Sequence, residues 1–92
     1  MNTINRYDGK VINIIRKMLK MSYADISDHM GISVSHYNKI ISGERFLERT
    51  RSASTLAVYN SLYKQAIEMP RGEAIFSAMC ELDGVARGSN CE

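Results

Sequence analysis

The chain has 92 residues, and its 12 Lys and Arg residues against 10 Asp and Glu residues give a formal net charge of +2. A composition that is 45% hydrophobic and 24% charged is typical of a globular domain, so it excludes a wholly disordered chain and a collagen-like chain. The length excludes a multidomain enzyme and predicts a single domain over residues 1–92.

The charge is unevenly distributed along the chain. Residues 1–51 carry nine basic and five acidic side chains, whereas residues 52–92 carry three basic and five acidic ones. The first part therefore has a net charge of +4 and the second a net charge of −2. A basic N-terminal half favours contact with a polyanion, although a chance distribution over a solvated surface explains the same numbers.

Cysteine usage and sorting signals indicate the compartment. Cys80 and Cys91 lack the spacing of a zinc site or a disulfide framework, so no metal and no cofactor is expected. Cys80 lies among apolar residues and is predicted to belong to the core, while Cys91 is predicted to be a free thiol in the tail. No stretch resembles a signal peptide or a membrane span, so we expect a cytoplasmic protein without a membrane partner.

Helical periodicity recurs along the chain, and strand patterns are nearly absent. The first predicted helix follows Asp8, which can serve as its N-cap. Its apolar stripe consists of Val11, Ile14, Ile15 and Met18. The second predicted helix begins with a capping box formed by Ser22 and Asp25. It ends at Gly31, because a left-handed residue is needed there and glycine adopts that conformation without steric cost.

The segment 22–43 has the pattern of a helix-turn-helix. Its second helix starts at the N-cap Ser33 and ends at Gly43. Such a motif needs a small residue where the helices cross, a glycine in the turn and apolar residues at fixed offsets. Ser27 and Gly31 meet the first two requirements. The apolar set consists of Ile26, Met30, Ile32, Tyr37 and Ile40.

The remainder of the chain is predicted to contain a loop and two more helices. Residues 44–51 are charged and form the loop, and an amphipathic helix covers about residues 52–68. A fifth apolar stripe ends near Gly84 and is followed by a flexible tail over residues 85–92. This stripe consists of Ile75, Phe76, Met79 and Cys80. The predicted fold class is therefore all-α, with about five helices.

The stretch from Met21 to Gly43, MSYADISDHMGISVSHYNKIISG, closely resembles the helix-turn-helix of the Cro/repressor (XRE-like) family. The resemblance covers roughly residues 10–63. It implies a lambda-repressor-like domain with a C-terminal helical extension, which binds double-stranded DNA sequence-specifically through the helix 33–42 in the major groove. The resemblance also implies that four residues meet base edges, namely Val34, Ser35, Asn38 and Lys39.

Helical geometry identifies the exposed face of the helix 33–42. At about 100° per residue, a Tyr37 directed at the core turns the opposite side chains to solvent. The outward set is Ser35, Lys39 and Ser42, flanked by His36, Asn38 and, at the N-terminal edge, Val34. Its chemistry suits base readout, because Lys39 can donate to guanine and Asn38 can pair with adenine. Val34 can contact a thymine methyl group.

Contacts to the DNA backbone are expected from helix N-termini, which offer unpaired N–H groups, and from arginines in the following loop. The expected residues are Ser22, Tyr23, Ser33, His36, Ser42, Arg45, Arg49 and Arg51. Glu44 and Glu48 lie between these arginines, so some of the arginines have an internal partner available.

Two positions depart from the family pattern. Relatives often carry Gln where Tyr23 stands, and a tyrosine hydroxyl can still reach a phosphate. Relatives also often pair a basic residue at the place of Arg16 with an acid where Ile41 stands. Since Ile41 cannot accept a hydrogen bond, Arg16 is expected to find another acid, such as Glu44, or to turn to solvent or DNA.

An enzyme is not expected, because His29 and His36 are the only histidines and form no metalloprotease, nucleophile-elbow or phosphate-loop motif. The apolar stripes of residues 52–83 exceed what three short helices need and favour a homodimer interface. The expected interface residues are Tyr63, Ile67, Ile75, Phe76 and Met79.

These patterns together predict a dimeric transcription regulator of phage, plasmid or bacterial type. We expect a repressor that binds an inverted-repeat operator, with recognition helices about 34 Å apart on successive major grooves. The alternative is an antitoxin or protein-interaction module, whose C-terminal helices bind a toxin or another protein partner.

Overall fold

A computed structural model of the chain describes residues 5–49 and 53–85. These residues contain helices and no strand, so the all-α prediction is confirmed. The five α-helices are α1 (Gly9–Met18), α2 (Tyr23–Met30), α3 (Val34–Ile41), α4 (Ala53–Glu68) and α5 (Gly72–Leu82), with a short 3-10 turn η1 (Leu47–Arg49) between α3 and α4.

The first three helices start at the predicted N-caps. A carboxylate oxygen of Asp8 accepts a hydrogen bond from the backbone N–H of Lys10 at 2.8 Å. The Ser22 hydroxyl accepts from the N–H of Asp25 at 3.0 Å, and the Asp25 carboxylate accepts from the N–H of Ser22 at 3.1 Å. This reciprocal pair is the predicted capping box. Gly31 ends α2 with φ 72°, the left-handed conformation that the turn requires.

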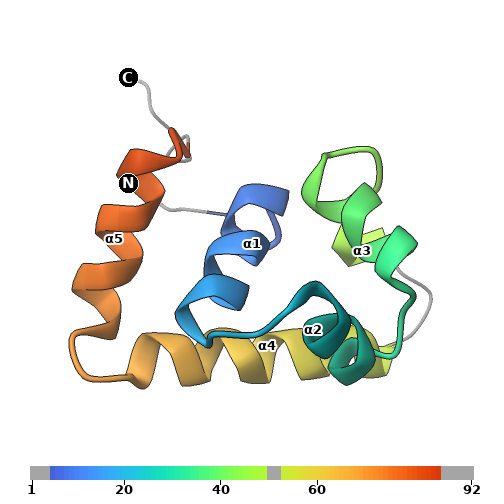
Figure 1. The fold of residues 1–92 in the computed structure, drawn as a ribbon, viewed down its shortest axis with the longest axis horizontal. Coiled ribbons are helices and arrows are strands. Elements are labelled where there is room, and N and C mark those ends of the chain that lie inside the picture. The colour runs from blue at the N-terminus through green and yellow to red at the C-terminus, as the bar shows by residue number, and fades with distance from the viewer. Residues whose placement is uncertain (1–4, 50–52, 86–92) are drawn as a thin grey trace.

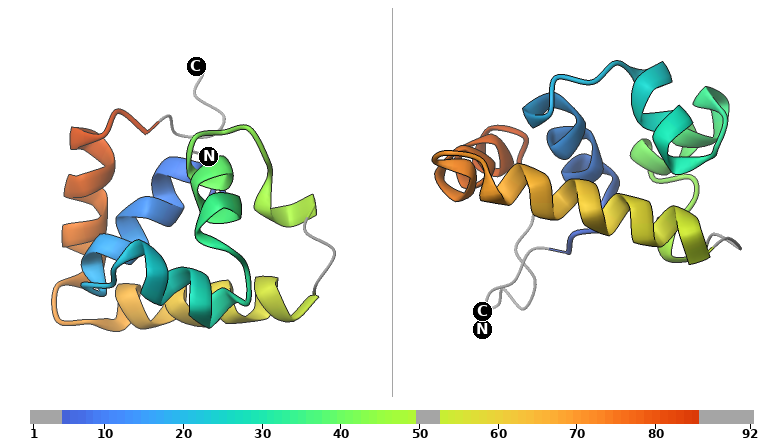
Figure 2. Two further views of the ribbon diagram at one scale, coloured as in Figure 1. Left: turned by 45° about the vertical axis from the view of Figure 1, so that its right-hand side comes forward. Right: turned by 90° about the horizontal axis from the view of Figure 1, so that it is seen from below.

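Helix α1 lies in the middle of the molecule, with α5 on one side, α3 on the other and α4 running beneath them (Figures 1 and 2). The molecule measures 35 × 29 × 21 Å, and α3 and α5 lie at opposite ends of its longest dimension (Figure 1). The core between these helices is formed by Val11, Ile12, Ile14, Ile15, Met18, Ile26, Met30, Tyr37, Ile40, Leu47, Tyr59, Leu62, Ala66, Phe76 and Cys80. The prediction of a buried Cys80 is confirmed.

An aromatic cluster joins the N-terminal segment to α4 and α5. The rings of Tyr7 and Tyr59 lie 6.0 Å apart, and Tyr63 meets Phe76 edge-on at 5.7 Å. The Tyr59 hydroxyl donates to the carbonyl of Arg6, and burial raises the pKa of that hydroxyl well above its usual range. The Arg6 guanidinium covers the Tyr63 ring at 4.9 Å.

This cluster corrects the predicted dimer interface. Phe76 is 6% exposed and belongs to the core, because α5 folds back onto α1 and α4 instead of extending away from the domain. Tyr63 is half-buried beneath Arg6, and Ile67 and Met79 are also half-buried. Of the five predicted interface residues, Ile75 alone is exposed.

The loop after α3 also differs from its prediction. Leu47 is fully buried, because the η1 turn directs it into the core. Thr55 at the start of α4 is buried as well, and its hydroxyl donates to the carbonyl of Met30 at 2.9 Å.

Cys91 lies outside the described residues, as does all of the predicted tail except Val85. Within the described residues, none of the helices combines the length and the apolar character that a membrane span requires.

Candidate nucleic-acid interface

The crossing of α2 and α3 is built from the predicted residues. Ser27 is 2% exposed at the crossing, and the side chains that join the two helices are buried in the core. These are Ile26 and Met30 from α2 and Tyr37 and Ile40 from α3. With these side chains facing inward, α3 presents its opposite side at the end of the molecule (Figure 1).

The outer side of α3 brings together the four residues predicted to contact bases. Val34 is 39% exposed, Ser35 and Asn38 are exposed, and Lys39 is half-buried. They line one open hollow, together with Ser42 and Glu44. An ammonium, an amide, a hydroxyl and a branched apolar group therefore share one surface, which is the set that discriminates base edges in a major groove. The Glu44 carboxylate adds an acceptor at the rim of this hollow.

The N-terminus of α3 provides backbone donors beside this face. The Ser33 hydroxyl accepts from the N–H of His36 at 3.0 Å, so it serves as the N-cap. The backbone N–H groups of Val34 and Ser35 have no acceptor within the described part of the chain. Together with the positive end of the helix dipole, these donors suit a phosphate. His36 is half-buried at the flank of the face.

The N-terminus of α2 is less open to a phosphate than predicted. The backbone N–H of Ser22 is already used by the Asp25 carboxylate, because the capping box is complete. These hydrogen bonds from the backbone and side chain of Ser22 lower the pKa of Asp25, which keeps a negative charge at this helix end. The donors that remain are the N–H groups of Tyr23 and Ala24 and the Tyr23 hydroxyl.

Arg16 is not paired with Glu44, the acid suggested as its partner, but with two neutral oxygens. Its Nε donates to the side-chain oxygen of Asn13 at 3.0 Å, and its Nη1 donates to the carbonyl of Met21 at 2.8 Å. One neutral oxygen within α1 and one in the turn between α1 and α2 are therefore within reach of the guanidinium and supply the acceptors that Ile41 cannot. No carboxylate in the described residues neutralises this half-buried charge.

The Arg16 guanidinium also holds Tyr23 in place. It lies 4.7 Å from the centre of the Tyr23 ring, within the range of a cation–π contact. The same ring meets Tyr37 edge-on at 5.4 Å. The first side chain of α2 is therefore fixed between a cation and a buried aromatic ring, and its 38% exposure leaves part of it open to solvent.

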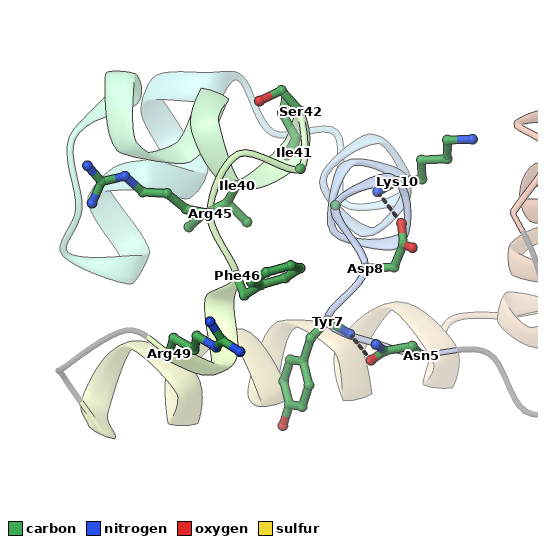
Figure 3. A pocket seen from close by; sticks show the side chains of 12 residues that line it. Asn5, Tyr7, Asp8, Lys10, Ile40, Ile41, Ser42, Arg45, Phe46 and Arg49 are labelled. Atoms are coloured by element: carbon green, nitrogen blue, oxygen red, sulfur yellow. Dashed lines mark hydrogen bonds between the residues drawn. The ribbon is translucent and has the colours of Figure 1, made fainter. Parts of the chain in front are cut away.

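The loop after α3 directs basic side chains to the surface. Arg45 and Arg49 are exposed and are among the residues that line the groove shown in Figure 3, and the Arg49 guanidinium lies 5.2 Å from the centre of the Phe46 ring. Neither arginine has a carboxylate partner among the described side chains, so pairing with Glu44 does not occur. Arg51 lies outside the described residues.

A groove of about 510 Å³ separates this loop from the start of α1 (Figure 3). Phe46 is 54% exposed and its ring points across the groove toward Asp8 and Tyr7. Sequence reasoning missed Phe46 because it stands within a run of charged residues, where an apolar side chain has no periodic neighbours. Gly9 also lines the groove and lies close to the backbone at the end of α3.

In residues 5–49 and 53–85, no three His, Cys, Asp or Glu side chains lie close enough to hold a metal ion. Comparison of the chain with protein-family models, with curated proteins and with solved structures finds no match.

Proposed function

We propose that this chain is a sequence-specific DNA-binding transcription regulator of the Cro/repressor type, with α3 as its recognition helix. The observation that carries the proposal is the outer face of α3, where four side chains suited to base edges line one open hollow. The buried stripe of the same helix lies on its other side, so this face is open to solvent and does not pack into the core. A cytoplasmic location is part of the proposal.

Each element of the interface has a distinct role in this proposal. Lys39 donates to guanine O6 and N7, Asn38 pairs with adenine, and Val34 packs on a thymine methyl group. The phosphates that flank the contacted bases are held by the free N–H groups at the start of α3 and by the arginines beyond its end. The base contacts supply sequence preference, whereas the phosphate contacts supply affinity that falls with salt concentration.

Arg16 and Tyr23 complete the backbone contacts in a manner specific to this chain. An arginine whose charge has no described carboxylate partner stands next to the positive end of α2 and behind the Tyr23 ring. The Tyr23 hydroxyl, held by two ring contacts, then donates to a phosphate where relatives use glutamine.

The experiment that tests the proposal is selection of bound sequences from a random duplex pool at fixed salt, followed by affinity measurements on the selected duplex. Lys39→Ala should cost about 1–3 kcal/mol at one base pair and relax the preference there. Arg45→Ala should weaken binding to all sequences alike and reduce the salt dependence. Lys64→Ala removes an exposed charge from α4 and should change neither.

Two results would overturn the proposal. If no duplex sequence is enriched, the chain is not a sequence-specific DNA-binding protein. If a sequence is enriched but Lys39→Ala leaves both affinity and preference unchanged, α3 does not read bases through the face described above.

A second candidate function is a protein-interaction module of the antitoxin type. It is favoured by one observation, the exposure of Ile75 and Leu82 on α5. A small protein that co-purifies with the chain in stoichiometric amounts, and is lost on substitution of Leu82, would support it.

A further inference from the structure

The hollow on the outer side of α3 contains one charged side chain that the base contacts proposed above do not use. Glu44 belongs to the loop after α3, yet it lines this hollow together with Lys39 and Ser42. Its side chain is exposed and has no hydrogen-bond or ion-pair partner within the described residues. A carboxylate without a described partner therefore stands on the surface that the proposed function turns toward DNA.

The end of α3 explains why a loop residue reaches this surface. Gly43 has φ 89°, a left-handed conformation that turns the chain back after the helix. The backbone N–H of Gly43 donates to the carbonyl of Ile40 at 3.1 Å. The backbone N–H of Arg45 donates to the carbonyl of Lys39, also at 3.1 Å. Glu44 stands between these two bonded residues, so its backbone is held beside the last turn of α3.

A carboxylate on a DNA-binding surface is unfavourable unless a base edge offers it a donor, because the phosphates repel its charge. In the major groove, guanine and thymine present acceptors, which a carboxylate cannot use. Adenine presents an amino group, but its N7 acceptor lies beside that group and repels a second acceptor. Cytosine presents the N4 amino group without a neighbouring acceptor of its own. Cytosine is therefore the base that the Glu44 carboxylate matches best.

We propose that Glu44 is a specificity-determining residue that accepts a hydrogen bond from the N4 amino group of a cytosine. This inference rests on the proposed function and adds one base contact to it. Lys39 lines the same hollow and donates to guanine, so the two side chains together match the guanine and the cytosine of a G·C pair or of neighbouring pairs. The preferred cytosine is therefore expected within one base pair of the guanine that Lys39 contacts.

Two simpler roles for Glu44 lead to different expectations. A carboxylate that only repels phosphates changes the affinity for every sequence by the same factor, because phosphates carry no sequence information. A carboxylate that only helps to hold the loop after α3 also affects all sequences alike. A base contact is the role that changes the preference at a single position of the DNA site.

Selection of bound sequences with the full chain, followed by affinity measurements at fixed salt, tests the inference. At one position the wild type should prefer cytosine over the other bases by about 5- to 150-fold, and Glu44→Ala should lose this preference. The same variant should bind a random-sequence duplex more tightly than the wild type, because one repulsive charge is removed. The ratio of the affinity for the selected duplex to that for the random duplex should therefore fall at least about fivefold.

Two further variants serve as comparisons. Glu44→Gln keeps the size of the side chain and one acceptor oxygen, but its amide group also donates to adenine N7, so the variant should accept adenine at this position as well as cytosine. Glu81→Ala removes an exposed carboxylate from α5, at the opposite end of the molecule from α3, and should change neither affinity nor preference (Figure 1). Circular dichroism confirms that each variant is folded.

A modified duplex tests the hydrogen bond itself. In this duplex the preferred cytosine is replaced by a pyrimidinone base that lacks the exocyclic amino group. The replacement should weaken binding of the wild type more than binding of Glu44→Ala, because the variant has no acceptor to leave unpaired. The two changes are then non-additive, as expected for groups in direct contact. The variant also corrects for any effect of the modified base on the duplex.

The outcomes separate this inference from the proposed function. If a sequence is enriched but Glu44→Ala changes the affinity for all duplexes by one common factor, Glu44 reads no base, and the proposed function stands without it. An equal loss of affinity for wild type and Glu44→Ala on the modified duplex likewise rules out the hydrogen bond to cytosine. If the wild type enriches no sequence at all, the proposed function fails, and this inference fails with it.

Discussion

The close approach of α1 and α3 depends on Gly9, the first residue of α1. A Cβ atom added at this position would lie 2.5 Å from the carbonyl oxygen of Ile40 and 2.7 Å from that of Ile41. Ordinary contacts of a Cβ begin at 3.4 Å, so the shorter distance is about 0.9 Å too small. Both oxygens belong to the backbone, so a side-chain rotation cannot relieve the contact. The end of α3 and the start of α1 would have to move apart.

Two effects of Gly9→Ala oppose each other. Alanine favours a helix over glycine by up to about 1 kcal/mol, and less at the first residue than in the interior. Overpacking of a tight contact costs about 1–3 kcal/mol, and here the obstacle is backbone. We therefore expect Gly9→Ala to lower the free energy of unfolding by about 1–2 kcal/mol. In a domain of this size each kcal/mol corresponds to about 4–8 °C in Tm.

Urea unfolding followed by circular dichroism measures this change. Lys10→Ala is the matched control, because Lys10 is exposed in the same helical turn, and its effect should stay within about 0.5 kcal/mol. The affinity of Gly9→Ala for the selected DNA should also fall, since the displaced segment includes the end of the recognition helix. A Gly9→Ala variant as stable as the wild type, or more stable, would refute the close contact between α1 and α3.

Three further predictions concern stability. Thr55→Val should cost about 1–2 kcal/mol in urea unfolding, because the buried carbonyl of Met30 loses the hydroxyl that donates to it, whereas an unchanged value would mean that the carbonyl finds another donor. Lys20 has φ 57°, so Lys20→Gly should relieve left-handed strain and stabilise the domain by about 0.5–1 kcal/mol, and a loss of Tm would contradict this. The folded-state pKa of Asp25 lies below its ordinary value of 3.8, so its carboxylate stabilises the fold above that pH and the contribution disappears as the pH falls through the lowered pKa. Asp25→Asn should therefore be less stable than wild type at neutral pH, and the difference should disappear as the pH falls below the lowered pKa, whereas a constant difference at all pH values would show that the capping interaction with Ser22 is not ionic.

Local chemistry determined where α1, α2 and α3 begin and where α2 ends, and these boundaries were predictable from the sequence. The caps at Asp8, Ser22 and Ser33 and the left-handed Gly31 depend on residues at most three positions away, so adjacent residues carry all the information needed. The exposed face of α3 was predictable for a related reason. One buried residue, Tyr37, is enough to orient the rest of a regular helix.

Tertiary structure decided which partners distant residues find. Phe76 was predicted to lie at an interface, yet it is in the core because α5 folds back onto α1 and α4. Leu47 was predicted to lie in a loop, yet it is buried because the η1 turn directs it inward. Arg16 donates to neutral oxygens that are close to it in the chain, because Ile41 offers no acceptor. The need for a glycine at Gly9 arises only because the end of α3 packs against that position.

The sequence by itself therefore determined the helices, their caps and the face of α3 that points outward, because each of these depends on residues close in the chain. Which apolar stripe is buried and which remains exposed on α5 depends on how the helices cross, and only the tertiary structure decided it. For the same reason, only the fold placed α3 and α5 at opposite ends of the molecule.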